Sequence, residues 1–177
     1  MRNNILSVIL VCVAMFAPVM GAHAQEIVPR KSGSVIEQIE NSNLQKNNQK
    51  IVDDLLSYAY TFRGVPYRHG AMSPRGFDCS GFTSYVFQKF GYKLDRTSGG
   101  QINDGQRVSR NELKPGDLVF FNGRAVGRRI GHVGIVTQVN EDNTFKFIHA
   151  ASRGITVSHS SETYYSRRYM GACRVVK

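Results

Sequence analysis

The chain has 177 residues, with 23 Lys and Arg against 13 Asp and Glu, which gives a formal net charge of +10 at pH 7. This length allows one domain with a sizeable core and excludes a chain of several full domains. The basic charge favours anionic partners such as wall polymers or acidic lipid headgroups. A basic face that only keeps the protein soluble accounts for the charge equally well, so charge alone does not separate an enzyme from a binding protein.

The N-terminal residues have the pattern of a targeting segment. Arg2 precedes an apolar run over residues 5–16, and Ala22-His23-Ala24 is a small-x-small triplet of the kind that signal peptidase recognises. We therefore predict a signal peptide at residues 1–24 and export to the periplasm or cell envelope, or release from the cell. A retained anchor and a lipoprotein attached through Cys12 are the alternatives; the apolar run is shorter than the roughly 20 residues that a spanning helix needs. After cleavage we expect no stable membrane insertion, no nucleic-acid partner and a monomer.

Residues 25–48 are polar, and we predict a flexible leader there with at most a short helix near 35–39. The domain itself is expected at residues 49–177. Its first helix is indicated by Ile51, Leu55 and Ala59, which fall on one helical face, before Gly64 and Pro66 end it. A loop rich in Gly and Pro follows over residues 66–77.

A second helix should begin at Asp78 or Cys79. Asp78 is a good N-cap residue, Phe82 and Val86 share one face of the predicted helix, and Gly91 ends it. A short helix is expected near 98–103, and strands at 118–121, 132–139, 144–150, 155–158 and 169–176. Helices first and strands afterwards predict an α+β fold in which the helices pack on one face of an antiparallel sheet.

Cys79 thus lies at a predicted helix N-terminus. The partial positive charge and free N–H groups of a helix end lower a thiol pKa and can hold an oxyanion. The adjacent Asp78 carboxylate opposes thiolate formation, so the thiol needs a histidine partner.

His132 and His149 qualify as partners. If the strands 132–139 and 144–150 are joined by a four-residue loop, Gly134 faces His149 and the two histidines share one side of the sheet. His132 then takes the thiol proton, and His149 bonds the far ring nitrogen of His132 and fixes its tautomer. Gly131 and Gly134 are expected to leave room for a substrate backbone.

Other uses of these residues remain open. A disulfide between Cys79 and Cys173 is the structural alternative in an exported protein. One thiol and two histidines without a paired ligand spacing are a weak metal signal, so we expect no metal and no cofactor. We take His69 and His159 as structural.

Six short motifs occur in order, and together they resemble the NlpC-type family of cell-wall cysteine peptidases. They are Gly64-Val65-Pro66-Tyr67, Phe77-Asp78-Cys79-Ser80-Gly81-Phe82, Arg96-Thr97-Ser98 with Gln101, the run 113–121, the run 132–136, and His149-Ala150-Ala151. The match extends from about residue 50 to the C-terminus.

The resemblance implies a papain-like fold and a Cys, His, polar triad formed by Cys79, His132 and His149. It also implies that Tyr67 donates to the oxyanion, that Asp78 and Ser80 contact the stem peptide, and that Arg96 and Ser98 line the cleft. The reaction it implies is hydrolysis of the bond between the γ-carboxyl of D-glutamate and a diamino acid in peptidoglycan stem peptides. The alternatives are an amidase or acyltransferase on the same scaffold, and a non-catalytic wall-binding protein.

Overall fold

The structure is a computed structural model that describes residues 35–123 and 129–177, so the predicted signal peptide at residues 1–24 lies outside it. The described residues belong to one unit of the chain, residues 34–177. Its elements in chain order are α1 (Val35–Tyr60), β1 (Met72–Ser73), β2 (Gly76–Phe77), α2 (Cys79–Gln88), α3 (Ser98–Gln101), β3 (Gln106–Val108), the 3₁₀ turn η1 (Arg110–Glu112), β4 (Leu118–Asn122), β5 (Ile130–Val139), β6 (Phe145–Ala151), β7 (Gly154–His159), α4 (Thr163–Ser166) and β8 (Tyr169–Arg174).

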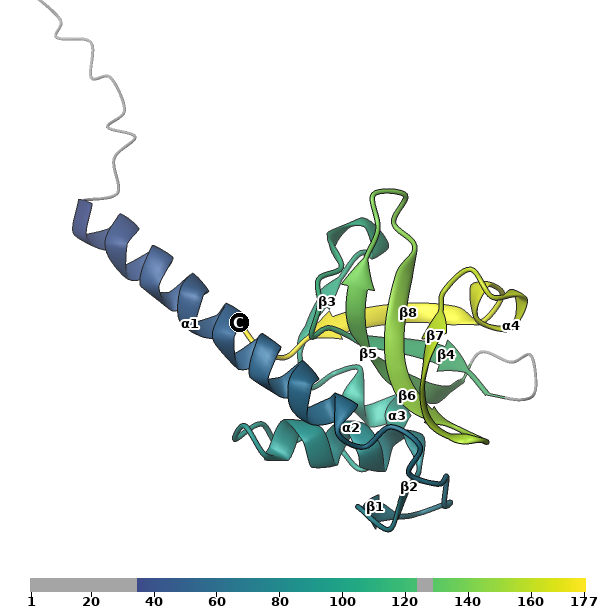
Figure 1. The fold of residues 1–177 in the computed structure, drawn as a ribbon. Helices are drawn as coiled ribbons and strands as arrows, with labels where there is room; N and C mark the ends of the chain where they lie inside the picture. The colour runs from purple at the N-terminus through teal and green to yellow at the C-terminus, as the bar shows by residue number, and fades with distance from the viewer. Residues whose placement is uncertain (1–34, 124–128) are drawn as a thin grey trace, which may run out of the picture. The chain divides into compact units, whose positions relative to one another are not determined.

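Six strands form one sheet in the order β3-β8-β4-β5-β6-β7, and every neighbouring pair is antiparallel (Figure 1). Helix α2 packs against β5 and β6. The side chains between them form the main core, with Phe82 and Val86 of α2 against Ile135 and Ile148 of the sheet. A second cluster of buried residues contains Phe121 and Tyr165. The prediction of an α+β fold with helices packed on an antiparallel sheet is therefore confirmed.

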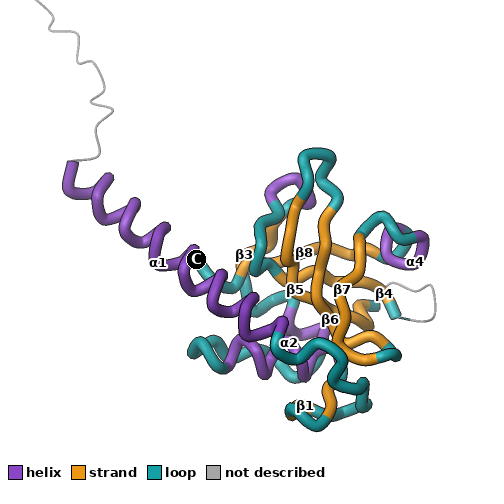
Figure 2. The backbone as a smooth tube through the Cα atoms, viewed as in Figure 1, coloured by secondary structure: helices purple, strands orange, loops and turns teal. Residues whose placement is uncertain are grey.

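Strands β4 to β8 and helices α2 and α3 lie where the sequence predicts them (Figure 2). The sequence analysis did not predict the two-residue hairpin β1–β2, strand β3 or helix α4. These elements span two to four residues. Such lengths are too short to show the periodicity of a strand or a helix.

Helix α1 corrects the expectation of a flexible leader. It runs without interruption from Val35 to Tyr60 and therefore includes residues 35–48, which were predicted to contain at most a short helix. The segment has no Gly or Pro, and its Glu, Gln, Lys and Leu residues have high helix propensity, so polarity alone was a poor reason to exclude a helix. No helix in the described ranges is both long and apolar enough to cross a membrane.

The β5–β6 hairpin differs from the predicted one in two places that cancel. Val139 pairs with Phe145, so the connecting loop has five residues rather than four. A bulge at Thr137 then shifts the pairing back by one, and Val136 pairs with Phe147 as the four-residue loop would require. The register at the functional end of the hairpin is therefore the predicted one, although the loop prediction was wrong.

Candidate active site

Cys79 is the first residue of α2, as predicted. Asp78 is the N-cap, and its carboxylate accepts a hydrogen bond from the backbone N–H of Gly81 at 2.7 Å. The thiol is nearly buried, and Sγ lies 3.9 Å from the carbonyl oxygen of Gly131. Sγ also interacts with the backbone N–H of Val133. The thiol therefore contacts the backbone on both sides of His132, at the start of β5.

The surroundings of Cys79 favour the neutral thiol. Burial raises the pKa of Cys79, and the Asp78 carboxylate raises it further, while the N–H groups of Ser80 and Val133 lower it in part. The opposing effect of Asp78 is the one expected from the sequence. Because the helix end does not outweigh burial, the thiol depends on a base to remove its proton.

His132 and His149 form a direct hydrogen bond. His132 Nε2 and His149 Nδ1 are 2.8 Å apart, and the two rings are perpendicular with centroids at 4.9 Å. The ring nitrogen of His132 that this bond leaves available is Nδ1. The predicted proximity of the two histidines is thus found in the structure, with His149 on the far nitrogen of His132.

Gly134 is buried and serves cross-strand packing, which corrects the expectation that it leaves room for a substrate, whereas Gly131 is exposed and lines a cleft beside His132. A Cβ on Gly131 would lie 2.7 Å from the Cα of Gly123, and a Cβ on Gly134 would lie 3.0 Å from the Cβ of His149. Any side chain at Gly134 would therefore push His149 away from β5. Close approach of strands β5 and β6 is what brings the histidine pair together.

Burial keeps both histidines neutral. It lowers the pKa of His132 to about 4, and it lowers the pKa of His149 to about 2 with a further contribution from the charge of His132. Neutral His132 is the form that accepts a proton, and it is present throughout the neutral pH range.

Acid should therefore destabilise the fold. Between the ordinary pKa of 6.5 and the folded pKa of about 4, the unfolded chain binds a proton at His132 that the folded chain does not. The contribution of neutral His132 to the free energy of unfolding is complete above the unfolded pKa. As the pH decreases through this window, that free energy falls by about 3 kcal/mol. Urea unfolding at several pH values should show a steeper loss for the native chain than for His132→Gln. The exposed-loop variant His69→Gln is the control, and equal slopes in all three proteins would contradict the expectation.

Tyr165 is a neighbour of the histidine pair that sequence reasoning missed. Its hydroxyl oxygen lies 3.3 Å from His149 Nε2, on the side of the ring opposite His132. Tyr165 comes from α4, a four-residue helix, and nothing in the local pattern singled it out. The three side chains form a row from β5 through β6 to α4.

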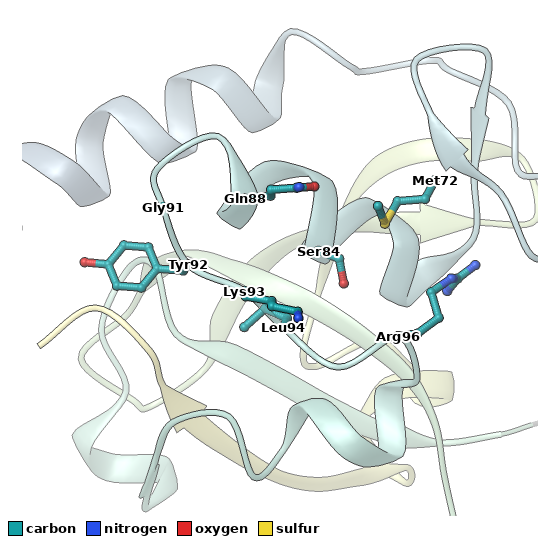
Figure 3. Close-up of a pocket in the computed structure, with 8 residues that line it drawn as sticks. All are labelled: Met72, Ser84, Gln88, Gly91, Tyr92, Lys93, Leu94 and Arg96. Carbon is teal, nitrogen blue, oxygen red and sulfur yellow. The ribbon is translucent and has the colours of Figure 1, made fainter.

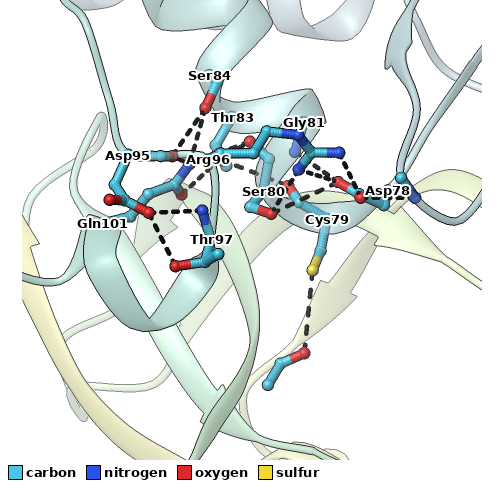
Figure 4. A network of polar contacts seen from close by, with 12 residues as sticks. Asp78, Cys79, Ser80, Gly81, Thr83, Ser84, Asp95, Arg96, Thr97 and Gln101 are labelled. Carbon is cyan, nitrogen blue, oxygen red and sulfur yellow. Dashed lines mark hydrogen bonds and ion pairs between the residues drawn. The ribbon is translucent and has the colours of Figure 1, made fainter.

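Asp78 is the centre of a polar network on the other side of Cys79 (Figure 4). Arg96 Nη2 contacts one oxygen of the Asp78 carboxylate at 2.7 Å, and Arg96 Nη1 contacts the other at 3.0 Å and Ser80 Oγ at 3.1 Å. Gly70 N–H donates to the same carboxylate at 2.9 Å. Burial alone would raise the pKa of Asp78, yet the hydrogen bonds from Arg96, Gly81 and Gly70 lower it overall. The network holds the 70–78 loop and Arg96 against the start of α2.

A cleft of about 700 Å³ runs past His132. Its walls include Tyr67, Gly131, His132, Arg153 and Tyr165. A second hollow of about 370 Å³ lies between α2 and the segment after Gly91, with Tyr92 at one end and Arg96 and Met72 at the other (Figure 3). Of the residues expected to bind substrate, Tyr67 lines the cleft, while Asp78, Ser80 and Arg96 belong to the network described above. Ser98 is buried at the start of α3.

The two cysteines of the described chain are both free thiols, so the disulfide alternative is not realised. Cys173 is fully buried, and its Sγ lies 3.4 Å from the carbonyl oxygen of Gln101. Within residues 35–123 and 129–177, no group of three or more His, Cys, Asp or Glu side chains is placed to hold a metal ion.

Iodoacetamide should modify Cys79 well before Cys173. Burial raises the pKa of Cys173 to about 12, whereas Cys79 is less deeply buried and contacts the backbone beside His132, whose imidazole is neutral. Because the thiol and imidazole are both neutral at rest, the modification rate should keep rising with pH into the alkaline range. Mass spectrometry of the two cysteine peptides measures both rates. A rate that is already level from acidic to neutral pH would contradict this, since it would indicate a preformed thiolate–imidazolium pair.

Comparison with known proteins identifies relatives of this chain. The family model described as the NlpC/P60 family matches residues 64–174. The Escherichia coli protein named "Murein DD-endopeptidase MepS/Murein LD-carboxypeptidase" is 38% identical over 144 residues, which is 78% of this chain and 70% of that protein. A "Probable endopeptidase p60" of Listeria welshimeri is 45% identical over 107 residues, 56% of this chain and 20% of that protein. The predicted enzyme class, a peptidase, is confirmed by the family and by these relatives.

Solved structures agree with the fold. A NlpC/P60 family protein from Bacillus cereus superposes with a TM-score of 0.63 and 32% identity, covering 71% of this chain and 40% of that one. A Staphylococcus aureus protein of the NLP/P60 family, described as similar to lipoprotein, gives a TM-score of 0.64 with 32% identity, covering 72% of this chain and 42% of that one. The family match spans well over half of the chain and includes Cys79, His132 and His149. This chain therefore belongs to the NlpC/P60 family.

Proposed function

We propose that the chain is an exported cysteine endopeptidase that hydrolyses peptide bonds in peptidoglycan. Cys79 is the nucleophile, His132 is the base, and His149 orients His132. The observation that carries the proposal is the 2.8 Å bond between the histidines, next to a thiol at a helix N-terminus whose Sγ contacts the backbone on both sides of His132. The E. coli relative, named as a murein endopeptidase, supports peptidoglycan as the substrate.

The reaction starts from neutral Cys79 and neutral His132. His132 Nδ1 takes the thiol proton as Sγ attacks the peptide carbonyl, and the oxyanion accepts hydrogen bonds from the backbone N–H of Cys79 and the hydroxyl of Tyr67. His132 then gives its proton to the leaving amine, which departs and leaves a thioester on Cys79. A water that His132 deprotonates hydrolyses the thioester and restores the thiol.

Two bonds are candidates for the cleavage. The motif resemblance favours the bond between the γ-carboxyl of D-glutamate and the diamino acid. The name of the E. coli relative, at 38% identity, favours a bond between two residues of D configuration, such as that of a peptide cross-link. Both are amide bonds that the same thiol can attack.

Mass spectrometry of defined muropeptides separates these bonds. An uncrosslinked disaccharide-tripeptide should lose its diamino acid if the γ-glutamyl bond is cut. A cross-linked dimer should fall into two monomers if the cross-link is cut. Intact substrates of both kinds, under reducing conditions and across several pH values, would move the assignment to an amidase or acyltransferase acting on another carbonyl.

The residues expected to bind the substrate have different roles in this proposal. Tyr67 lines the cleft, and its hydroxyl is the proposed hydrogen-bond donor to the oxyanion. The carboxylate of Asp78 already accepts from Arg96, Gly70 and Gly81, so we propose that Asp78 and Ser80 hold Arg96 in place, and that the exposed side of Arg96 meets the substrate. The role of Ser98 at the cleft remains a proposal.

The proposed setting is the cell envelope, where peptidoglycan is found. Export by the signal peptide at residues 1–24, a peptidase domain that includes residues 49–177 and the monomeric state belong to this proposal. N-terminal sequencing of the protein recovered from the envelope, which should begin at Gln25, tests the export step.

A further inference from the structure

We propose that Tyr165 is a positioning residue of this peptidase, whose hydroxyl holds His149, and through it His132, in the tautomers that the reaction needs. The inference rests on the proposed function. It assigns a role to α4, the short helix between β7 and β8 that none of the six motifs includes.

The geometry places Tyr165 where it can act on His149. The Tyr165 hydroxyl is 3.3 Å from His149 Nε2, and its ring meets the His149 ring edge-on, with centroids 5.4 Å apart. His149 is fully buried, and the ring of Tyr165 is held on its other sides by Phe121 and Phe147. A buried imidazole has few alternative partners, so this contact decides where its second ring nitrogen bonds.

The protons of the row can be assigned one by one. A neutral imidazole carries a single N–H. For His132 Nδ1 to accept the thiol proton, the hydrogen of His132 must be on Nε2, from which it is donated to His149 Nδ1. His149 then carries its own hydrogen on Nε2 and donates it to the hydroxyl oxygen of Tyr165. A side-chain hydrogen bond links Tyr165 and Ser158. A serine hydroxyl can donate or accept, and the order proposed here requires that the Ser158 oxygen accept the hydroxyl proton of Tyr165.

Removal of the Tyr165 oxygen would reverse this order. An N–H at His149 Nε2 would be buried without an acceptor, which is costly. His149 would instead place its hydrogen on Nδ1 and donate it to His132 Nε2. The hydrogen of His132 would then be on Nδ1, the nitrogen that has to receive the thiol proton, and His132 would be unable to act as the base.

The test is Tyr165→Phe, with Tyr169→Phe as its matched control. Tyr169 also packs against Phe121 in the second buried cluster, and its hydroxyl has no hydrogen-bond partner in the described part of the chain. Both variants remove one hydroxyl from a largely buried ring. Tyr165→Phe should lower kcat on the muropeptide that the native chain cleaves by roughly ten- to a hundredfold, with KM unchanged. Tyr169→Phe should leave both parameters unchanged.

The nitrogen NMR signals of the histidine rings provide a readout that loss of packing would not produce. In the native chain, both His132 and His149 should carry their hydrogen on Nε2, and in Tyr165→Phe both hydrogens should move to Nδ1. Native tautomers in the Tyr165→Phe variant would overturn the proposal. If that variant does not fold, Ser158→Ala replaces it, because the freed hydroxyl proton of Tyr165 would be donated to His149 Nε2 and cause the same shift.

This readout also separates the two proposals. The tautomers and the alkylation rate of Cys79 are measured without a peptide substrate. A native chain that cleaves no muropeptide but shows the expected tautomer change would contradict the proposed function and support the role of Tyr165. Cleavage by the native chain with unchanged tautomers in the variant would support the proposed function and contradict the role of Tyr165.

Discussion

Replacement of Cys79 by alanine should abolish peptidoglycan hydrolysis, lowering kcat by a factor of about a thousand or more. Cys173, the other cysteine in the described part of the chain, is buried against Gln101. The substitution removes one nearly buried sulfur and leaves Asp78 as the cap of α2, so the fold should persist. The rate of muropeptide cleavage and the melting temperature, measured on the same preparations, check the two parts of this expectation.

Cys173→Ala is the matched control for Cys79→Ala. It also removes a buried thiol, but it should leave kcat unchanged and affect only stability through the cavity that it creates. Hydrolysis retained by Cys79→Ala, or lost equally in both variants, would sink the assignment of Cys79 as the nucleophile.

Replacement of Asp78 by alanine should lower the free energy of unfolding by about 3 kcal/mol. The variant loses the N-cap of α2, the hydrogen bond from Gly70 and the partner of Arg96. It should also make the Cys79 thiol more acidic, because the Asp78 carboxylate raises the pKa of Cys79. Stability and thiol reactivity should therefore change in opposite directions.

The stabilisation by Asp78 depends on pH with a definite sign. The pKa of Asp78 in the folded chain is lower than its ordinary value of 3.8, so the contribution is present above that value and is lost as pH falls through the folded pKa. Urea unfolding at neutral and strongly acidic pH measures the difference between the native chain and Asp78→Ala. The exposed pair of Lys50 and Asp54 supplies the control Asp54→Ala, which should change stability little. An equal effect of the two substitutions would argue against the network around Asp78.

Local signals in the sequence were sufficient to locate the nucleophile. Asp78 at an N-cap position and the apolar face that begins with Phe82 predict the start of α2, and the structure begins that helix at Cys79. The contact between His132 and His149 follows from strand alternation once the pairing of β5 with β6 is known. The pairing was correct at the histidines because the extra loop residue is offset by the bulge at Thr137. A bulge of this kind leaves no clear mark in a single sequence, so the agreement depended on two cancelling differences.

Long-range contacts were beyond the sequence. The pairing of Arg96 with Asp78 joins residues 18 positions apart through a loop. The contact of Tyr165 with His149 depends on how a four-residue helix is placed after β7. Helix α1 was missed for a different reason, since residues 35–48 lack the apolar periodicity that identifies a packed helix but still have helical propensity.

The bulge at Thr137 also has a consequence for protein engineering. It lies between the five-residue turn of residues 140–144 and the pair Val136 and Phe147, which in turn lies between the bulge and the two histidines. The bulge already compensates for one extra residue in the loop. A peptide tag or a fluorescent domain inserted in that turn should therefore leave the register of the strands beyond the bulge unchanged. The turn is therefore an attachment point at which the enzyme can be labelled without moving its histidines. For the same reason, a change in the length of this turn should cost little activity.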